Sequence, residues 1–126
     1  MASNNITSFL NEALTNSQEA KSLLAKRKFF DSFEKSYLSI YSTAKAVANE
    51  NTGIITPIDY LNQLDSMVEQ EKLDVVFYDA LFKAIAMGEK SAEFHDSINQ
   101  KDAEEIFDFS IQVLKKAREI YDAQKG

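Results

Sequence analysis

Cysteine and tryptophan are absent from this 126-residue chain, which also contains one histidine, one proline and three glycines. Without cysteine, the chain has no disulfide, no thiol nucleophile and no thiolate metal ligand. One histidine is too few for a di-iron site built on two Glu-x-x-His pairs. It is also too few for a catalytic zinc site, which takes two or three histidine or cysteine ligands. These absences predict that the protein binds no metal ion.

The common phosphate-binding loops and long apolar runs are also absent. Neither a GxxxxGK[ST] loop nor a GxGxxG sequence occurs, and we therefore expect no cofactor. No run of about 18 apolar residues could span a bilayer. The N-terminus lacks the positive segment and the apolar stretch of a signal peptide. We predict a cytoplasmic protein that makes no contact with a membrane.

Basic residues are the minority among the charged side chains. The 14 lysines and arginines face 20 aspartates and glutamates, which gives a net charge of -6. This balance argues against binding to duplex DNA, although a local basic patch can still contact phosphate. A hydrophobic content of 44% and a charged content of 27% are typical of globular proteins. We expect one domain, residues 1–126.

Apolar residues recur every three or four positions in five stretches, which is the spacing of a buried helical face. The predicted helices span residues 8–25, 31–49, 57–70, 74–93 and 100–123. Connections of about four to eight residues favour antiparallel neighbours, because they leave little room for crossovers. The predicted fold is therefore an all-α, up-and-down bundle of five helices.

Polar side chains at the predicted helix starts are expected to cap them: Asp31, Thr56, Asp74 and Asn99. The signal is strongest at Thr56, because Pro57 stands at the first helical position and Asp59 three residues after the cap. Asn99 is likewise followed three residues later by an acid, Asp102. The basic run 26–28 suits the negative pole at the end of the first helix.

Two features of the predicted helices have both a structural and a functional interpretation. Tyr37 and Tyr41 lie one turn apart, and such an aromatic stripe is either core or the wall of a groove for a ligand or partner. Gly88 falls inside a predicted helix, where glycine costs about 1 kcal/mol relative to alanine. Either a neighbouring helix or ligand approaches closely there, or the helix is mildly kinked.

Three segments resemble proteins of the HEPN-domain family. Residues 28–47, KFFDSFEKSYLSIYSTAKAV, are similar to the family segment in which a basic and aromatic turn leads into a helix of aromatic and small residues. Residues 81–87, LFKAIAM, look like its penultimate helix, and residues 101–117, KDAEEIFDFSIQVLKKA, like its closing helix. The resemblance implies a four-helix up-and-down core with one additional helix, and homodimerisation. It also implies a role around RNA or nucleotides, often in toxin–antitoxin systems beside a nucleotidyltransferase partner.

Active members of that family carry an Arg-x4-6-His motif, from which this chain departs. Neither Arg27 nor Arg118 has a histidine four to six residues behind it, and the nearest equivalent is Lys90 with His95. Lysine lacks the planar fork with which arginine holds phosphate through two bonds. We therefore predict a non-catalytic HEPN-like module, a homodimer, that binds a protein partner, a nucleotide or RNA.

The predicted binding groove lies beside the second and fourth helices. The residues assigned to it are Tyr37, Tyr41, Lys45, Phe77, Ala84 and Gly88. Arg27 and Lys28 are assigned to phosphate contact, with a solvated helix end as the simpler interpretation.

Two alternatives remain open at this point. The first is a metal-independent endoribonuclease of the toxin type, in which His95 transfers the proton and Lys90 holds the phosphate. An isolated histidine near a helix end is otherwise a solvated surface residue. The second alternative is a structural helical bundle of unknown role.

Overall fold

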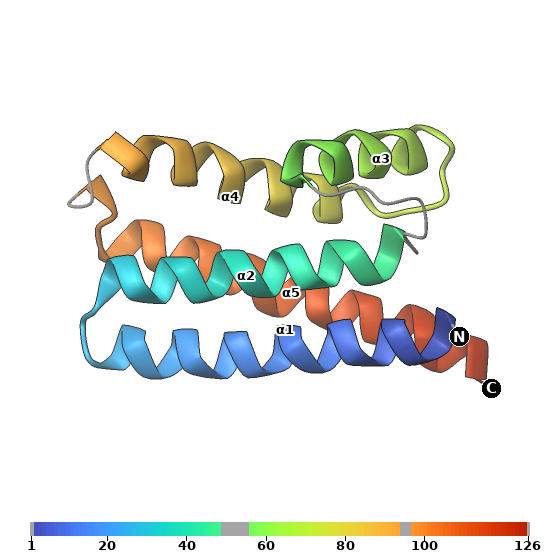
Figure 1. Cartoon of the computed structure of the whole chain (residues 1–126), viewed down its shortest axis with the longest axis horizontal. Coiled ribbons are helices and arrows are strands. Elements are labelled where there is room, and N and C mark those ends of the chain that lie inside the picture. The colour runs from blue at the N-terminus through green and yellow to red at the C-terminus, as the bar shows by residue number, and fades with distance from the viewer. Residues whose placement is uncertain (1, 49–55, 94–96, 126) are drawn as a thin grey trace.

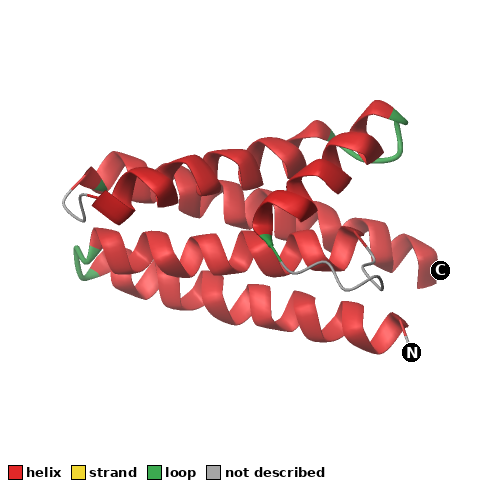
Figure 2. Cartoon of the chain, turned by 45° about the horizontal axis from the view of Figure 1, so that its top comes forward, coloured by secondary structure: helices red, strands yellow, loops and turns green. Residues whose placement is uncertain are grey.

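A computed structural model describes residues 2–48, 56–93 and 97–125, and this part of the chain is a bundle of α-helices with no strand (Figures 1 and 2). The helices are α1 (Ala2–Ala25), α2 (Phe29–Ala48), α3 (Pro57–Glu69), α4 (Val75–Glu93) and α5 (Gln100–Lys125). The predicted all-α bundle is therefore confirmed. No helix in the described ranges combines the length and the apolar character needed to cross a membrane.

Four long helices form the body of the bundle, and the shorter α3 packs on its outside. Helix α1 packs against α2 and α5, and α4 packs against α2 and α5 from the other side. The 13-residue α3 lies on α2 and α4. Consecutive long helices run in opposite directions, so the N- and C-termini lie at the same end (Figure 1).

Two helices begin earlier than the sequence pattern indicated. Helix α1 starts at Ala2 rather than at residue 8, and Ile6 in the added turns packs against the core. Helix α2 starts at Phe29, and the backbone N–H of Ser32 already donates to the carbonyl of Lys28 over 2.9 Å. Asp31 consequently lies in the first turn of α2, and the prediction that it caps this helix was wrong.

The other three predicted caps are confirmed by hydrogen bonds to backbone N–H groups. Thr56 Oγ1 accepts from Asp59 over 3.2 Å, Asn99 Oδ1 accepts from Asp102 over 2.9 Å, and Asp74 Oδ1 accepts from Val76 over 2.9 Å. The Asp102 carboxylate accepts in return from the Asn99 backbone over 3.3 Å. This reciprocal pair is a capping box, which satisfies two N–H groups that the helix itself leaves without partners.

Helices α1 and α3 end in the same way, on a charged residue with a left-handed backbone. Arg27 has φ 63°, and the N–H groups of Arg27 and Lys28 donate to Leu24 and Leu23. Glu71 has φ 60°, and the N–H groups of Glu71 and Lys72 donate to the carbonyls of Val68 and Met67. Both ends are Schellman motifs, in which glycine usually holds the left-handed position.

Helices α1, α2 and α5 bury small polar side chains together with apolar ones. Their fully buried serines are Ser17, Ser32, Ser36, Ser39 and Ser110. Ser39 Oγ lies 2.8 Å from the carbonyl of Ala13, and Ser32 Oγ donates to the carbonyl of Ala20 over 2.8 Å. Small side chains let the helix backbones approach closely, and hydrogen bonds between helices offset the cost of burying hydroxyls.

Candidate ligand pocket between α2 and α4

A pocket of about 380 Å³ lies between the first half of α2 and the last turns of α4. Helix α2 provides aromatic and aliphatic side chains together with one carboxylate, and α4 provides small residues. The lining residues are Phe30, Phe33, Glu34, Tyr37, Leu38, Gly88, Ser91 and Ala92. Spacings of three and four residues put each set on one face of its helix.

Gly88 sets the shape of the pocket, because α2 approaches α4 closely at this residue. A β-carbon placed on Gly88 would lie 3.2 Å from Cε2 of Tyr37 and 3.9 Å from Cζ of Phe33. Helix α4 continues without interruption from Val75 to Glu93. The Ser91 hydroxyl turns back onto its own helix and donates to the carbonyl of Gly88 over 3.0 Å. Gly88 therefore lets the Tyr37 ring pack directly against α4.

Three aromatic side chains form the α2 wall. The ring centroids of Phe30 and Phe33 are 6.3 Å apart, and those of Phe33 and Tyr37 are 6.1 Å apart in an edge-to-face arrangement. Phe33 is buried, whereas Phe30 and Tyr37 are half-buried. The pKa of Tyr37 is raised, first by burial and then by the nearby Tyr41 and Glu89.

The residues predicted for the groove do not all meet in this pocket. Tyr37 and Gly88 do, and they touch. Phe77 and Ala84 are in the core, with 3% and 0% of their surface exposed. They belong to the same α4 face as Gly88, but neighbouring helices cover that face along most of its length.

Tyr41 and Lys45 lie further along α2, at a second aromatic cluster. The Lys45 ammonium is 4.5 Å from the centre of the Tyr41 ring and 5.5 Å from that of Phe9. The Tyr41 ring packs edge-to-face on Tyr60 of α3 at 5.5 Å. The second half of this α2 face is therefore covered by α3, and the pocket is confined to the first half.

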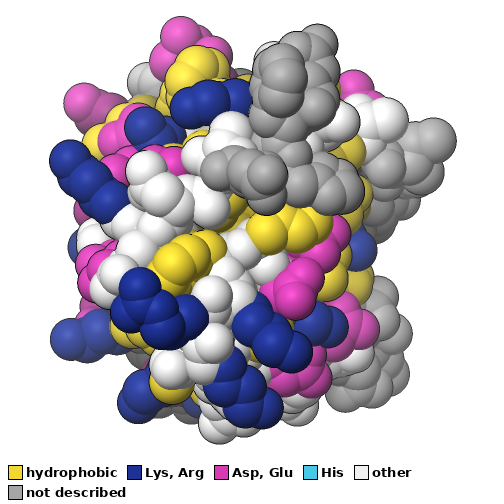
Figure 3. Space-filling model, turned by 90° about the vertical axis from the view of Figure 1, so that its left-hand side faces the viewer, with side chains coloured by type: hydrophobic (Ala, Val, Ile, Leu, Met, Phe, Trp, Pro, Cys, Tyr) yellow, Lys and Arg dark blue, Asp and Glu magenta, His cyan; other side chains and the backbone are white. Residues whose placement is uncertain are grey.

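The basic residues predicted for phosphate contact or catalysis lie near one end of the bundle. Arg27 and Lys28 are exposed in the turn between α1 and α2, and the Arg27 guanidinium lies 5.6 Å from the centre of the Phe29 ring. Lys90 is exposed near the end of α4, and His95 lies outside the described residues. Figure 3 views this end, where lysine and arginine side chains gather on the lower part with acidic ones between them.

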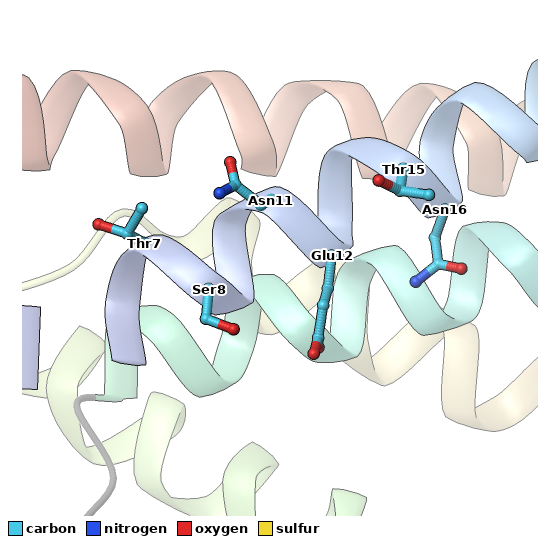
Figure 4. A pocket seen from close by; sticks show the side chains of 6 residues that line it. All are labelled: Thr7, Ser8, Asn11, Glu12, Thr15 and Asn16. Carbon is cyan, nitrogen blue, oxygen red and sulfur yellow. The ribbon is translucent and has the colours of Figure 1, made fainter. Parts of the chain in front are cut away.

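Two other hollows have a more polar or more strongly charged lining. One is a polar face of α1 alone, with side chains that project separately from a single helix (Figure 4): Thr7, Ser8, Asn11, Glu12, Thr15 and Asn16. The other, of about 640 Å³, lies beside the α3–α4 turn, where Lys116 pairs with Asp74 at 3.1 Å. There the Val76 N–H and then Lys116 lower the pKa of Asp74. Neither is lined by more than one aromatic residue, whereas three aromatic residues line the α2–α4 pocket.

No protein-family model, curated protein or solved structure matches this chain. Within the described ranges, no group of three histidine, cysteine or acidic side chains is placed to hold a metal ion. The candidate site in the described part of the chain is the pocket between α2 and α4, which is lined by three aromatic side chains.

Sequence reasoning did not assign several lining residues to the site: Phe30, Phe33, Glu34, Leu38, Ser91 and Ala92. The helical spacing could have indicated them, because these residues lie on the same helix faces as Tyr37 and Gly88. Assigning them to one site also requires knowing that the start of α2 lies beside the end of α4, and the sequence does not show this.

Proposed function

We propose that this chain is a non-catalytic, HEPN-like helical module that acts as a homodimer and binds a ligand in the pocket between α2 and α4. One observation carries the proposal: in the pocket of about 380 Å³, a wall of aromatic rings on α2 faces small residues of α4, and Gly88 lets the Tyr37 ring pack against α4. Small-molecule sites typically have volumes of about 300–1,000 Å³, mostly apolar walls and a few polar groups. The pocket has each of these properties.

The position of the basic residues bears on how a nucleotide would be held. Arg27, Lys28 and Lys90 are not among the described lining residues, and the charged side chain that does line the pocket is Glu34. A ligand with phosphate inside the pocket would meet a carboxylate of like charge. This arrangement supports a ligand whose buried part carries no phosphate.

Binding can be tested by screening small molecules with backbone amide resonances as the readout. The probes are uncharged, cationic and anionic aromatic fragments, with adenosine monophosphate as the nucleotide. We expect members of the panel to shift the amides of Gly88, Ser91 and Ala92. Ala92→Phe should fill the pocket and abolish these shifts, whereas Ala86→Phe, the same substitution on an exposed face of α4, should preserve them. If no probe shifts the pocket amides, the proposed binding function is wrong.

The non-catalytic part of the proposal has its own test. Wild-type protein and a His95→Ala variant are incubated with structured RNA in the presence of a chelator, and the products are resolved on a denaturing gel. We expect no cleavage by either protein. Cleavage by the wild type that the variant loses would instead establish the endoribonuclease alternative, with His95 as the proton-transfer residue.

A further inference from the structure

The rings that line the α2 wall of the pocket are tilted relative to one another. Phe30 and Phe33 are tilted by 35°, and Phe33 and Tyr37 by 88°. The face of an aromatic ring has a negative potential and attracts a cation that lies within about 6 Å of its centroid. Several rings set at angles around one space are the arrangement by which proteins recognise quaternary ammonium groups.

The charges around the pocket have the sign that suits such a ligand. Glu34 is the charged residue among the described lining residues, and its carboxylate is exposed at the rim. Glu89 stands next to Gly88 and is close enough to Tyr37 to raise the pKa of its hydroxyl, after the larger effects of burial and Tyr41. Lys35, the neighbour of Glu34, is held 2.9 Å from Glu19 of α1. Two carboxylates, those of Glu34 and Glu89, therefore stand beside the pocket.

The same helix already holds an ammonium group between aromatic rings at its other end. Lys45 Nζ lies 4.5 Å from the centre of the Tyr41 ring and 5.5 Å from that of Phe9. That cluster is filled by the chain's own lysine. The pocket offers comparable rings with open volume beside them.

Rings, charge and volume together point to a ligand class: the geometry assigns the α2–α4 pocket to a free small organic cation with an ammonium or trimethylammonium head. This inference rests on the proposed binding function. A free small molecule fits better than a protein segment, because the lining spans only residues 30–38 of α2 and 88–92 of α4. An extended peptide would need a longer groove.

The inference can be tested with two probes that match in size and shape and differ in charge. Choline carries a trimethylammonium group, and 3,3-dimethyl-1-butanol carries a neutral tert-butyl group in its place. Each is titrated into the protein while the amide shifts of Gly88, Ser91 and Ala92 are followed. We expect choline to bind about three- to thirtyfold more tightly than the alcohol, which is the range that cation–π contacts provide.

Two substitutions separate the contributions of ring and charge. Tyr37→Leu removes a ring and Glu34→Gln removes the carboxylate, and each should weaken choline binding several-fold while leaving the weak binding of the alcohol nearly unchanged. Phe109→Leu and Glu104→Gln, both on α5, are the matched controls, because neither residue lines the pocket. The controls should bind choline like the wild type.

Each outcome bears on a different part of the proposal. If the alcohol or adenosine monophosphate binds at the pocket amides as tightly as choline, the cation inference is wrong and the binding function stands. If a peptide containing trimethyllysine binds more than about tenfold tighter than choline, the pocket belongs to a protein partner and not to a free ligand. If nothing shifts these amides, both proposals fail.

Discussion

The hydroxyl oxygens of Ser17 and Ser39 lie 2.7 Å apart at the centre of the bundle, where α1 meets α2. Ser17 Oγ also lies 3.2 Å from Ser110 Oγ of α5, which donates to the carbonyl of Phe107 over 2.6 Å. Three helices are thus joined through three serines in a region that excludes water. A buried hydroxyl contributes to stability only where it has a hydrogen-bond partner.

Ser39→Ala and Ser36→Ala should change stability in opposite directions. Both serines are fully buried on α2, but Ser36 Oγ has no hydrogen-bond partner among the described residues. Alanine improves helix propensity at both positions, so the comparison isolates the hydrogen bonds. We expect Ser36→Ala to be more stable than the wild type and Ser39→Ala to be less stable, with a difference of about 1–2 kcal/mol. Urea denaturation measures both, and equal stabilities would contradict this account.

The left-handed residues that end α1 and α3 give a second prediction. An L-residue in this conformation costs about 1–2 kcal/mol, and glycine avoids most of that cost. Glycine also makes the unfolded chain more flexible, so we expect Glu71→Gly to stabilise the protein by about 0.5–1 kcal/mol. Arg27→Gly should increase the free energy of unfolding by less than Glu71→Gly, because it also removes the contact of Arg27 with the Phe29 ring.

Lys72→Gly is the control for this pair, because Lys72 follows Glu71 without sharing its positive φ. Thermal unfolding followed by circular dichroism should show the transition of Lys72→Gly at or below the wild-type temperature. A transition of Glu71→Gly that is lowered like that of Lys72→Gly would mean that the left-handed backbone does not strain this turn.

These turns also show which parts of the fold the sequence can reveal. Thr56, Asp74 and Asn99 cap helices through contacts within three residues, so the local pattern predicted them correctly. The turns at Arg27 and Glu71 carry no glycine, and their residue types gave no signal of a left-handed backbone. A cap or turn can be predicted from the sequence when it carries the residue type that usually occupies that position. It cannot be predicted in this way when another residue type stands there.

The candidate pocket was predictable only in part, for a different reason. Tyr37 and Tyr41 share one face of α2, but α4 lies beside the first and α3 beside the second. Phe77, Ala84 and Gly88 share one face of α4, but the first two are sealed in the core. Helical periodicity identifies a face, and only tertiary packing decides which turns of that face remain open.

The proposed homodimer gives a third prediction, which concerns the outer face of α4. Phe82 is 53% exposed and stacks on Tyr78 with their ring centroids 5.9 Å apart, and Val75 is 50% exposed. Contiguous exposed apolar side chains are the usual core of an interface between subunits. We expect Phe82→Asp to weaken self-association by at least about tenfold in sedimentation experiments.

Ile111→Asp is the matched control for this interface, since Ile111 is an exposed apolar residue of α5. It should leave the dimer intact. If Phe82→Asp has no more effect than Ile111→Asp, the α4 face is not the contact surface. If the wild type stays monomeric at micromolar concentrations, the homodimer itself is wrong.

Tyr121 provides a prediction about alkaline pH. Its hydroxyl donates to the carbonyl of Ala46 over 2.6 Å, and burial raises its pKa above the ordinary value of 10.0. The folded state therefore keeps the phenol protonated at a pH where the unfolded chain has lost that proton. The resulting contribution to stability is complete below about pH 10 and declines as pH rises toward the folded pKa, by at most about 1.4 kcal/mol per pH unit for one tyrosine.

Tyr121→Phe should separate the hydrogen bond of this tyrosine from its titration. Between pH 6 and 8 the variant should be less stable than the wild type by a constant amount, about 1 kcal/mol for the lost hydrogen bond. Above about pH 10 that difference should shrink, because the wild type loses the stability that depends on a protonated Tyr121, whereas phenylalanine has no proton to lose and the other tyrosines are the same in both proteins. Urea denaturation at pH 7 and at several values from 9 to 11 measures the difference, and a gap that stays constant or widens would show that Tyr121 does not titrate as its burial requires.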